Sequence, residues 1–347
     1  MEKNVIQDNK LPWADNLRVL ATAGVILLHV SSVLAHKYDA VAFNYWMTAN
    51  VYDSMVRFCV PIFLMLTGAL ILPKHIHLKP FFRKSFIRII YPFLFWSVVY
   101  IIFNLRDKLA SGDFDDIWRF VGKSLQFGSV FHLWYVYMLI GVYLFIPIIS
   151  KWIRNSNENE ILFFLSIWVA TFFLKGPIIV NYVPKIDLSN FAGYMGYVVL
   201  GYYLSVKEFG SVKKTRIYGA ALFIAGFLLT ATGTALLTIH NGEFFKKFYI
   251  YMTPNVMLLS VGLFLWVKAS VLRNNLMIRL RNFLSKYSYG IYLVHILVLF
   301  YLNEIGINWN LLHPVIGIPV TAILCLAISG LIIYIVAKLP FGKHIAG

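Results

Sequence analysis

Two ionisable residues occupy one apolar stretch near the start of the chain. Arg18 is followed by VLATAGVILL and then by His29, eleven residues later. In an α-helix, eleven steps of about 100° make three turns plus roughly 20°, so both side chains share a face and lie roughly 16 Å apart along the axis. Neutral histidine suits a general base that takes a proton from a hydroxyl. Arg18 suits a phosphate or a carboxylate.

Each residue also has a purely structural interpretation. His29 is then a hydrogen-bonded histidine inside a helix bundle, and Arg18 is one of the basic residues that flank a span on the cytoplasmic side. If Arg18 lies at a membrane surface, however, His29 lies near the middle of a bilayer about 30 Å thick. Ionisable residues at that depth are costly, which favours a functional role.

Arg57 raises the same question, because the apolar sequence FCVPIF follows it directly. We expect a span to begin close to Arg57, near the outer surface, after a polar and aromatic loop over 36–54. The arginine must then snorkel outward or face a polar cavity. In a cavity it is a candidate catalytic residue that stabilises negative charge on an oxygen.

Three basic residues gather where another span begins, at Arg83, Lys84 and Arg88. Lys84 and Arg88 are one helical turn apart and should share a face, which Arg83 does not. One interpretation is a grip on the phosphates of a cytoplasmic, nucleotide-bearing donor. Membrane topology or binding of anionic lipids explains the same residues.

Two further motifs contain candidate substrate-binding residues. FHLWYVY at 131–137 contains His132, Trp134 and Tyr135, and SYGIYLVH at 288–295 contains Ser288 and His295 on one helical face. An interface or core histidine explains His132 or His295 taken singly. The sequence has no metal-ligand spacing, no Gly-x-Ser-x-Gly and no phosphate-binding glycine loop, so we expect no metal and no covalent serine chemistry.

The elements that must position these residues are apolar helices. Of the 347 residues, 60% are hydrophobic and 13% are charged, whereas soluble domains are nearer 45–50% and 25%. Apolar blocks of helical length predict an all-α polytopic membrane protein with about ten transmembrane helices. The predicted spans are roughly 17–35, 55–72, 86–104, 131–149, 160–175, 190–206, 217–237, 250–268, 284–302 and 313–337.

The charge pattern predicts the orientation. If the N-terminus is cytoplasmic, inner segments hold 21 of the 31 Lys and Arg residues, which favours both termini in the cytoplasm. The same asymmetry explains the net charge of +16 without nucleic acid as a partner. Both cysteines, Cys59 and Cys325, fall in apolar spans, so we expect no disulfide.

Four stretches together resemble the membrane-bound acyltransferase 3 family. They are DNLRVLATAGVILLH at 15–29, RFCVPIFLMLTG at 57–68, FHLWYVY at 131–137 and SYGIYLVH at 288–295. The family's first-helix signature, an arginine, ten residues and a histidine, is met by Arg18 and His29. Its frequent pair of arginines three apart is broken, since Ser85 precedes Arg88, and Lys84 or Arg83 substitutes. Within the family the chain is similar to bacterial surface-polysaccharide O-acetyltransferases of the enterobacterial common antigen type.

The resemblance implies a single transmembrane acyltransferase domain over 1–347 in the bacterial inner membrane, among membrane lipids. It implies a cytoplasmic acetyl-CoA donor and a glycan or lipid-linked sugar as acceptor. His29 matches the catalytic histidine and Arg18 its essential partner. The main alternative is a transporter or flippase of polysaccharide intermediates, but such proteins often show inverted repeats, and we find no internal symmetry. A sensor or scaffold is a third interpretation, without a soluble domain to favour it.

Overall fold

The computed structural model describes residues 11–111, 117–174 and 192–347, and these residues form helices and no strand. Eight helical stretches in this part are long and apolar enough to cross a membrane, which confirms the all-helical membrane class. They are Pro12–Ala35, Phe43–Ile71, Leu78–Arg106, Phe131–Asn155, Val212–Asn241, Lys246–Lys268, Asn275–Glu304 and Pro314–Val336. The spans predicted at 160–175 and 190–206 correspond to two shorter helices, α8 (Glu158–Leu174) and α9 (Met195–Val206).

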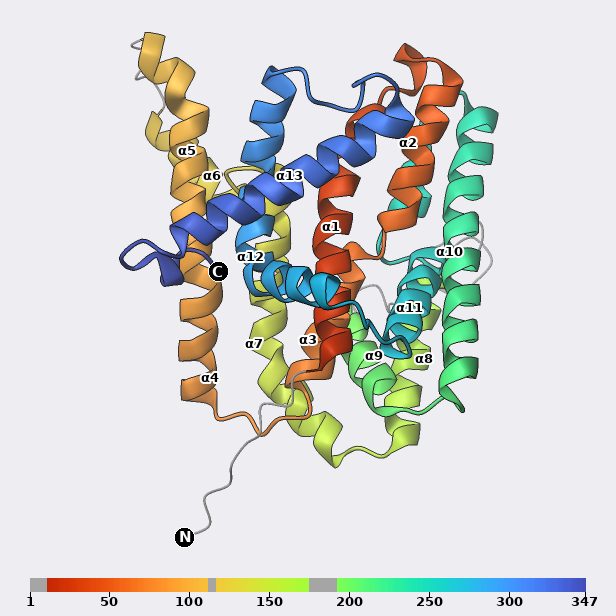
Figure 1. Ribbon diagram of the computed structural model, residues 1–347. Coiled ribbons are helices and arrows are strands. Elements are labelled where there is room, and N and C mark those ends of the chain that lie inside the picture. The colour runs from red at the N-terminus through yellow and green to blue at the C-terminus, as the bar shows by residue number, and fades with distance from the viewer. Residues whose placement is uncertain (1–10, 112–116, 175–191) are drawn as a thin grey trace.

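Helix α1 (Pro12–Ala35) forms the centre of the bundle. It packs against α2 (Phe43–Val56), α3 (Cys59–Ile71), α11 (Pro254–Lys268), α12 (Asn275–Glu304) and α13 (Pro314–Val336). Figure 1 shows α1 surrounded by these helices, with α10 (Val212–Asn241) at one edge and α5 (Tyr91–Ser111) at the other. The helix that carries Arg18 and His29 therefore contacts most of the elements that could complete a site.

Helices α2 and α3 correct the prediction for this region. Residues 36–54 were expected to form a loop, but most of them belong to α2, so Arg57 lies inside a helical stretch of 29 residues rather than at its start. The stretch is interrupted at Arg57 and Phe58. Pro61 explains the interruption, because it has no N–H to donate to the carbonyl of Arg57.

Helices α4 (Leu78–Ser85) and α5 form one long rod, joined by a π-helical segment over Phe86–Ile90 (Figure 1). Pro92 lacks the N–H that would bond to the carbonyl of Arg88, which accounts for the change of hydrogen bonding at this place. A short helix, α6 (Ile117–Phe127), follows α5.

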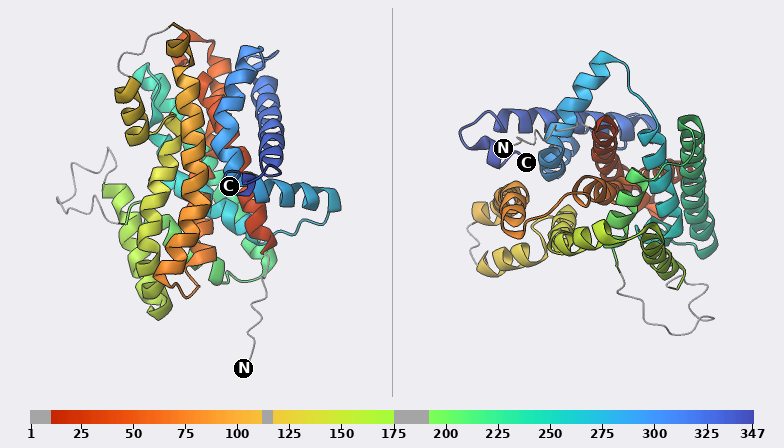
Figure 2. Two further views of the ribbon diagram at one scale, coloured as in Figure 1. Left: turned by 90° about the vertical axis from the view of Figure 1, so that its left-hand side faces the viewer. Right: turned by 90° about the horizontal axis from the view of Figure 1, so that it is seen from below.

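The remaining helices pack around this core, as the view from below in Figure 2 shows. Helix α7 (Trp134–Asn155) follows a 3-10 turn over Phe131–Leu133, and the 3-10 turn Lys246–Tyr249 lies between α10 and α11. Helices α3 and α9 approach so closely that a Cβ at Gly68 or Gly201 would meet backbone atoms of the other helix. Small residues at such crossings are typical of membrane helix packing. Both cysteines are buried and unpaired.

Candidate active site

Arg18 and His29 lie on one uninterrupted helix, α1, as their spacing predicted. His29 is half-buried. Its ring faces two segments that are far away in sequence, the turn before α7 and the middle of α12. The site is therefore assembled by tertiary packing around α1.

The structure brings three histidines together. The ring centre of His29 lies 5.2 Å from that of His295 and 6.4 Å from that of His132, and the rings of His132 and His295 are 5.0 Å apart. We call these three residues the histidine cluster. Phe131 covers one side of it, with its ring centre 5.2 Å from His29. Two residues that were weak candidates singly thus become neighbours of the proposed base.

The buried ring nitrogens of this cluster have few partners. His295 is fully buried, and its Nδ1 contacts the carbonyl oxygen of Tyr292 at 2.5 Å. Its Nε2 and both ring nitrogens of His132 have no hydrogen-bond partner among the described residues. Buried polar groups are nearly always hydrogen-bonded, so these nitrogens are suited to a hydroxyl group of a ligand or to water.

A row of tyrosines leads from the histidine cluster toward Arg18. Tyr292 donates to the backbone carbonyl of His132, and its ring lies 5.5 Å from that of Tyr135 and 6.5 Å from that of Tyr289. Tyr143 interacts electrostatically with Tyr135 and Tyr289 and also with Arg18. We call Tyr135, Tyr143, Tyr289 and Tyr292 the tyrosine row. It provides a mixed apolar and polar lining between the two ends of α1.

Two other predicted substrate residues lie outside the cluster. Trp134 is exposed, and its ring packs 6.1 Å from both Tyr194 and Tyr251. Ser288 is buried on α12, two turns before His295, and no hydrogen bond links it to the cluster in the described part of the chain. The shared helical face alone did not bring Ser288 to the histidines.

Arg18 is held at the other end of α1. Its Nη1 donates to Asp15 and to Ser285 on α12, at 2.9 Å each, and the Ser285 hydroxyl donates to Asp15 at 2.6 Å. Arg18 also interacts electrostatically with Arg88. Asp15 neutralises only one of these two interacting guanidinium groups, that of Arg18. The remaining positive charge favours an anion.

The predicted basic cluster is divided by the fold. Arg88 is associated with Arg18, whereas Arg83 and Lys84 line a separate hollow of the surface together with Lys79, Pro80 and Ile87. Lys84 lies in the last turn of α4 and Arg88 in the π-helical segment at Phe86–Ile90. That the two side chains share a face stays a prediction.

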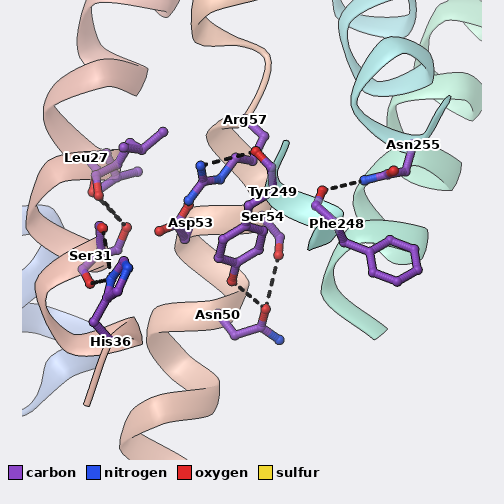
Figure 3. A network of polar contacts seen from close by, with 12 residues as sticks. Leu27, Ser31, His36, Asn50, Asp53, Ser54, Arg57, Phe248, Tyr249 and Asn255 are labelled. Atoms are coloured by element: carbon purple, nitrogen blue, oxygen red, sulfur yellow. Dashed lines mark hydrogen bonds and ion pairs between the residues drawn. The ribbon is translucent and has the colours of Figure 1, made fainter. Parts of the chain in front are cut away.

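Arg57 neither snorkels outward nor stands free in a cavity. It is 9% exposed and forms an ion pair with Asp53, one turn earlier on α2 (Figure 3). Asp53 is fully buried and was missed in the sequence, although a carboxylate four residues before an arginine is a recognisable pair on a helix. Reading 36–54 as a loop concealed that signal. Arg57 and His29 are close enough to interact electrostatically.

Comparison with known proteins identifies the family of the chain. The chain has no significant match among curated proteins or solved structures. Residues 11–334 match the model of a protein family described as an acyltransferase domain, the acyltransferase 3 family. The match includes α1, the histidine cluster, the tyrosine row and the Arg57 pair. This multi-pass, helical chain therefore belongs to the acyltransferase 3 family of membrane acyltransferases.

Proposed function

We propose that the protein transfers an acetyl group from acetyl-CoA to a hydroxyl of a cell-surface polysaccharide or its lipid-linked precursor, with His29 as general base. The observation that carries the proposal is the position of His29. It lies half-buried beside two buried imidazoles, on the same helix as Arg18, which interacts electrostatically with Arg88 and favours anions. Membership of an acyltransferase family supports the reaction class.

In this proposal acetyl-CoA enters from the cytoplasm. Its phosphates bind Arg18 and Arg88, and the surface hollow with Arg83 and Lys84 attracts them by charge. The thioester arm lies along the tyrosine row and reaches the histidine cluster. The roughly 16 Å between Arg18 and His29 along α1 separate the charged end of the donor from its reacting end.

The chemistry needs one base and one stabilised oxyanion. His29 takes the proton from the acceptor hydroxyl, whose oxygen forms a bond to the thioester carbonyl carbon. Arg57 or Tyr135 stabilises the negative charge that develops on the carbonyl oxygen. The carbon–sulfur bond then breaks, the thiolate of CoA takes the proton from His29, and the ester is left on the acceptor.

The acceptor binds from the side of the histidine cluster that faces away from the donor phosphates. His132 and His295 hold its hydroxyls through their unpartnered nitrogens, and Trp134, Tyr135 and Ser288 complete the acceptor region. Exposed aromatic side chains such as Trp134 are suited to a sugar ring at a membrane interface. We place the protein in the bacterial inner membrane with both termini in the cytoplasm.

Donor binding and turnover by the detergent-purified protein test this proposal. The wild type should bind acetyl-CoA and release free CoA slowly. Arg88→Ala should weaken binding by about tenfold, the scale of one charge-assisted hydrogen-bond contact of about 1.4 kcal/mol or more. Arg83→Ala, a matched control in the separate hollow, should weaken it much less.

Equal losses in the two variants would contradict the donor site at Arg18 and Arg88. No binding and no CoA release by the wild type would contradict the enzyme itself and favour the transporter.

A further inference from the structure

A pair of opposite charges is buried where membrane-spanning helices meet. The Asp53 side chain is fully buried, and its carboxylate forms an ion pair with Nη2 of Arg57. Removing two charges from water is costly unless each is paired and further hydrogen-bonded. A buried pair of this kind inside a membrane domain therefore indicates a functional position, with Asp53 as a group that the mechanism above does not use.

Arg57 is fixed from several sides at once. Its Nη1 donates to the carbonyl oxygen of Tyr249 at 3.3 Å, and its guanidinium carbon lies 4.0 Å from the centre of the Tyr249 ring. The Tyr249 hydroxyl donates to Asn50 at 2.7 Å, and Ser54 donates to the same oxygen at 3.2 Å (Figure 3). The guanidinium thus has one defined orientation.

Hydrogen bonds to two further helices also hold the surroundings of Arg57 in place. The Asn50 amide donates to the carbonyl of Ala231 on α10 at 2.9 Å. The Asn255 amide, on α11, donates to the carbonyl of Phe248 at 2.7 Å and so anchors the turn that carries Tyr249. Figure 3 shows this network running from α2 through the turn to α11. Such networks are suited to holding a side chain within the narrow tolerance that catalysis requires.

One donor of Arg57 is left over. Its Nε is buried and has no hydrogen-bond acceptor among the described residues, whereas both Nη atoms are engaged. Helix α1 packs against the junction beside Arg57, because a Cβ at Gly24 would lie 3.4 Å from Cys59 and from the Phe58 ring. Arg57 also interacts electrostatically with His29 on that helix, so the spare donor belongs to the region of the proposed base. A buried N–H without an acceptor is costly. That cost is offset if an oxygen that becomes negative during the reaction accepts a hydrogen bond from Nε–H.

We propose that Asp53 is a positioning residue, which holds Arg57 so that its free Nε–H stabilises the oxyanion formed near His29. This inference rests on the proposed acyl transfer and chooses Arg57 over Tyr135 as the oxyanion donor. Asp53 itself contacts no substrate. It neutralises Arg57 and fixes the direction of its guanidinium.

The test is a double-mutant cycle on the purified full-length protein, with thermal unfolding and acetyl-CoA turnover measured for each variant. Asp53→Asn leaves an uncompensated buried cation and Arg57→Gln an uncompensated buried anion, so both single variants should unfold at lower temperature. The double variant Asp53→Asn with Arg57→Gln has no buried charge and should recover most of the wild-type stability. Asp39→Asn, at an exposed aspartate, is the control and should change neither property.

The kcat values of these variants should not change in parallel with their unfolding temperatures. Arg57→Gln should lower kcat by about 100-fold or more, as expected when one oxyanion donor is removed, with little change in KM for acetyl-CoA. Asp53→Asn should lower kcat at least about tenfold at temperatures where it stays folded, because misplacing a catalytic group is costly. The stable double variant should stay as slow as Arg57→Gln.

A double variant that regains wild-type kcat together with its stability would show that the pair is only structural and would overturn the inference. Wild-type kcat in folded Asp53→Asn would overturn it as well. A wild type without any acetyl-CoA turnover would instead refute the proposed function, and this inference with it.

Discussion

His132 illustrates how a single residue in this site differs from an ordinary core residue. It is 1% exposed and packs against Tyr100, Tyr292 and His295, yet neither ring nitrogen has a hydrogen-bond partner in the described part of the chain. A side chain selected for stability alone would be apolar here. The unsatisfied nitrogens thus favour a role in ligand binding, since functional sites often retain groups that reduce stability.

His132→Leu is therefore expected to stabilise the protein while reducing its activity. Removing two unsatisfied buried polar atoms should raise the free energy of unfolding by about 1 kcal/mol. Turnover with acceptor should fall at least about tenfold if one hydrogen bond to the acceptor hydroxyls is lost. Thermal unfolding and a transfer assay measure the two effects.

His240→Leu, at an exposed position of α10, is the control and should leave turnover unchanged. A less stable His132→Leu protein with wild-type turnover would contradict the assignment of His132 to the acceptor.

Among the helices, the sequence predicted the strongly apolar ones and missed α2, which contains several polar residues. Helix α1 and helices over the predicted spans 131–149 and 284–302 are present, because each contains an apolar segment long enough to cross a membrane. Helix α2 was read as a loop, since Asn44, Thr48, Asn50 and Asp53 lower its hydropathy. In the structure two of these residues turn inward: Asn50 donates to the carbonyl of Ala231 on α10, and Asp53 pairs with Arg57 at the end of α2.

For the site as well, the sequence predicts relations within one helix but not contacts between helices. The spacing of Arg18 and His29 is a local property of one helix, so it could be predicted. The histidine cluster joins α1, the turn before α7 and α12, and no periodicity reveals such contacts; only the resemblance grouped their motifs. The π-helical segment at Phe86–Ile90 leaves no hydrophobic pattern either, although Pro92 marks its place.

Helix packing gives a prediction at this scale. A Cβ at Gly201 of α9 would meet the backbone of Met65 on α3, whereas a Cβ at Gly141 of α7 would meet nothing within 4 Å. Gly201→Ala should therefore destabilise the protein by about 2 kcal/mol through overpacking. Gly141→Ala should stabilise it by up to about 1 kcal/mol, because alanine favours the helix. Thermal unfolding of both variants checks the contrast, and equal shifts would contradict the close crossing of α3 and α9.

At the scale of the whole molecule, the connections after α3, α7 and α9 lie at the end of the bundle where α1 begins (Figure 1). Lysine and arginine residues lie in or beside these connections, among them Lys74, Arg154, Lys207 and Lys213, which agrees with the proposed cytoplasmic location of that end. Arg18 and Arg88 belong to the same end, so the proposed donor site and these connections share one side. In the proposed reaction the acceptor approaches the histidine cluster from the bundle interior or the opposite side.

Thiol labelling in intact cells tests this orientation. With Cys59 and Cys325 replaced by alanine, a single cysteine is introduced by Lys213→Cys near the start of α10 or by Glu243→Cys just after its end. Both positions are exposed. A membrane-impermeant thiol reagent that crosses the outer membrane should label Glu243→Cys only, and Lys213→Cys only after the inner membrane is opened. Labelling of Lys213→Cys in intact cells would reverse the orientation and the side of donor entry.

The proposed acyl transfer depends on His29 as its base. The most direct measurement is CoA release from acetyl-CoA by purified protein with a lipid-linked sugar extract, for the wild type, His29→Gln and His36→Gln. His36 lies just beyond α1 and is exposed, so its variant should match the wild type. His29→Gln should bind acetyl-CoA normally but release CoA at least about 100-fold more slowly, the usual contribution of a general base. CoA release by His29→Gln at the wild-type rate would contradict the role of His29 as the general base.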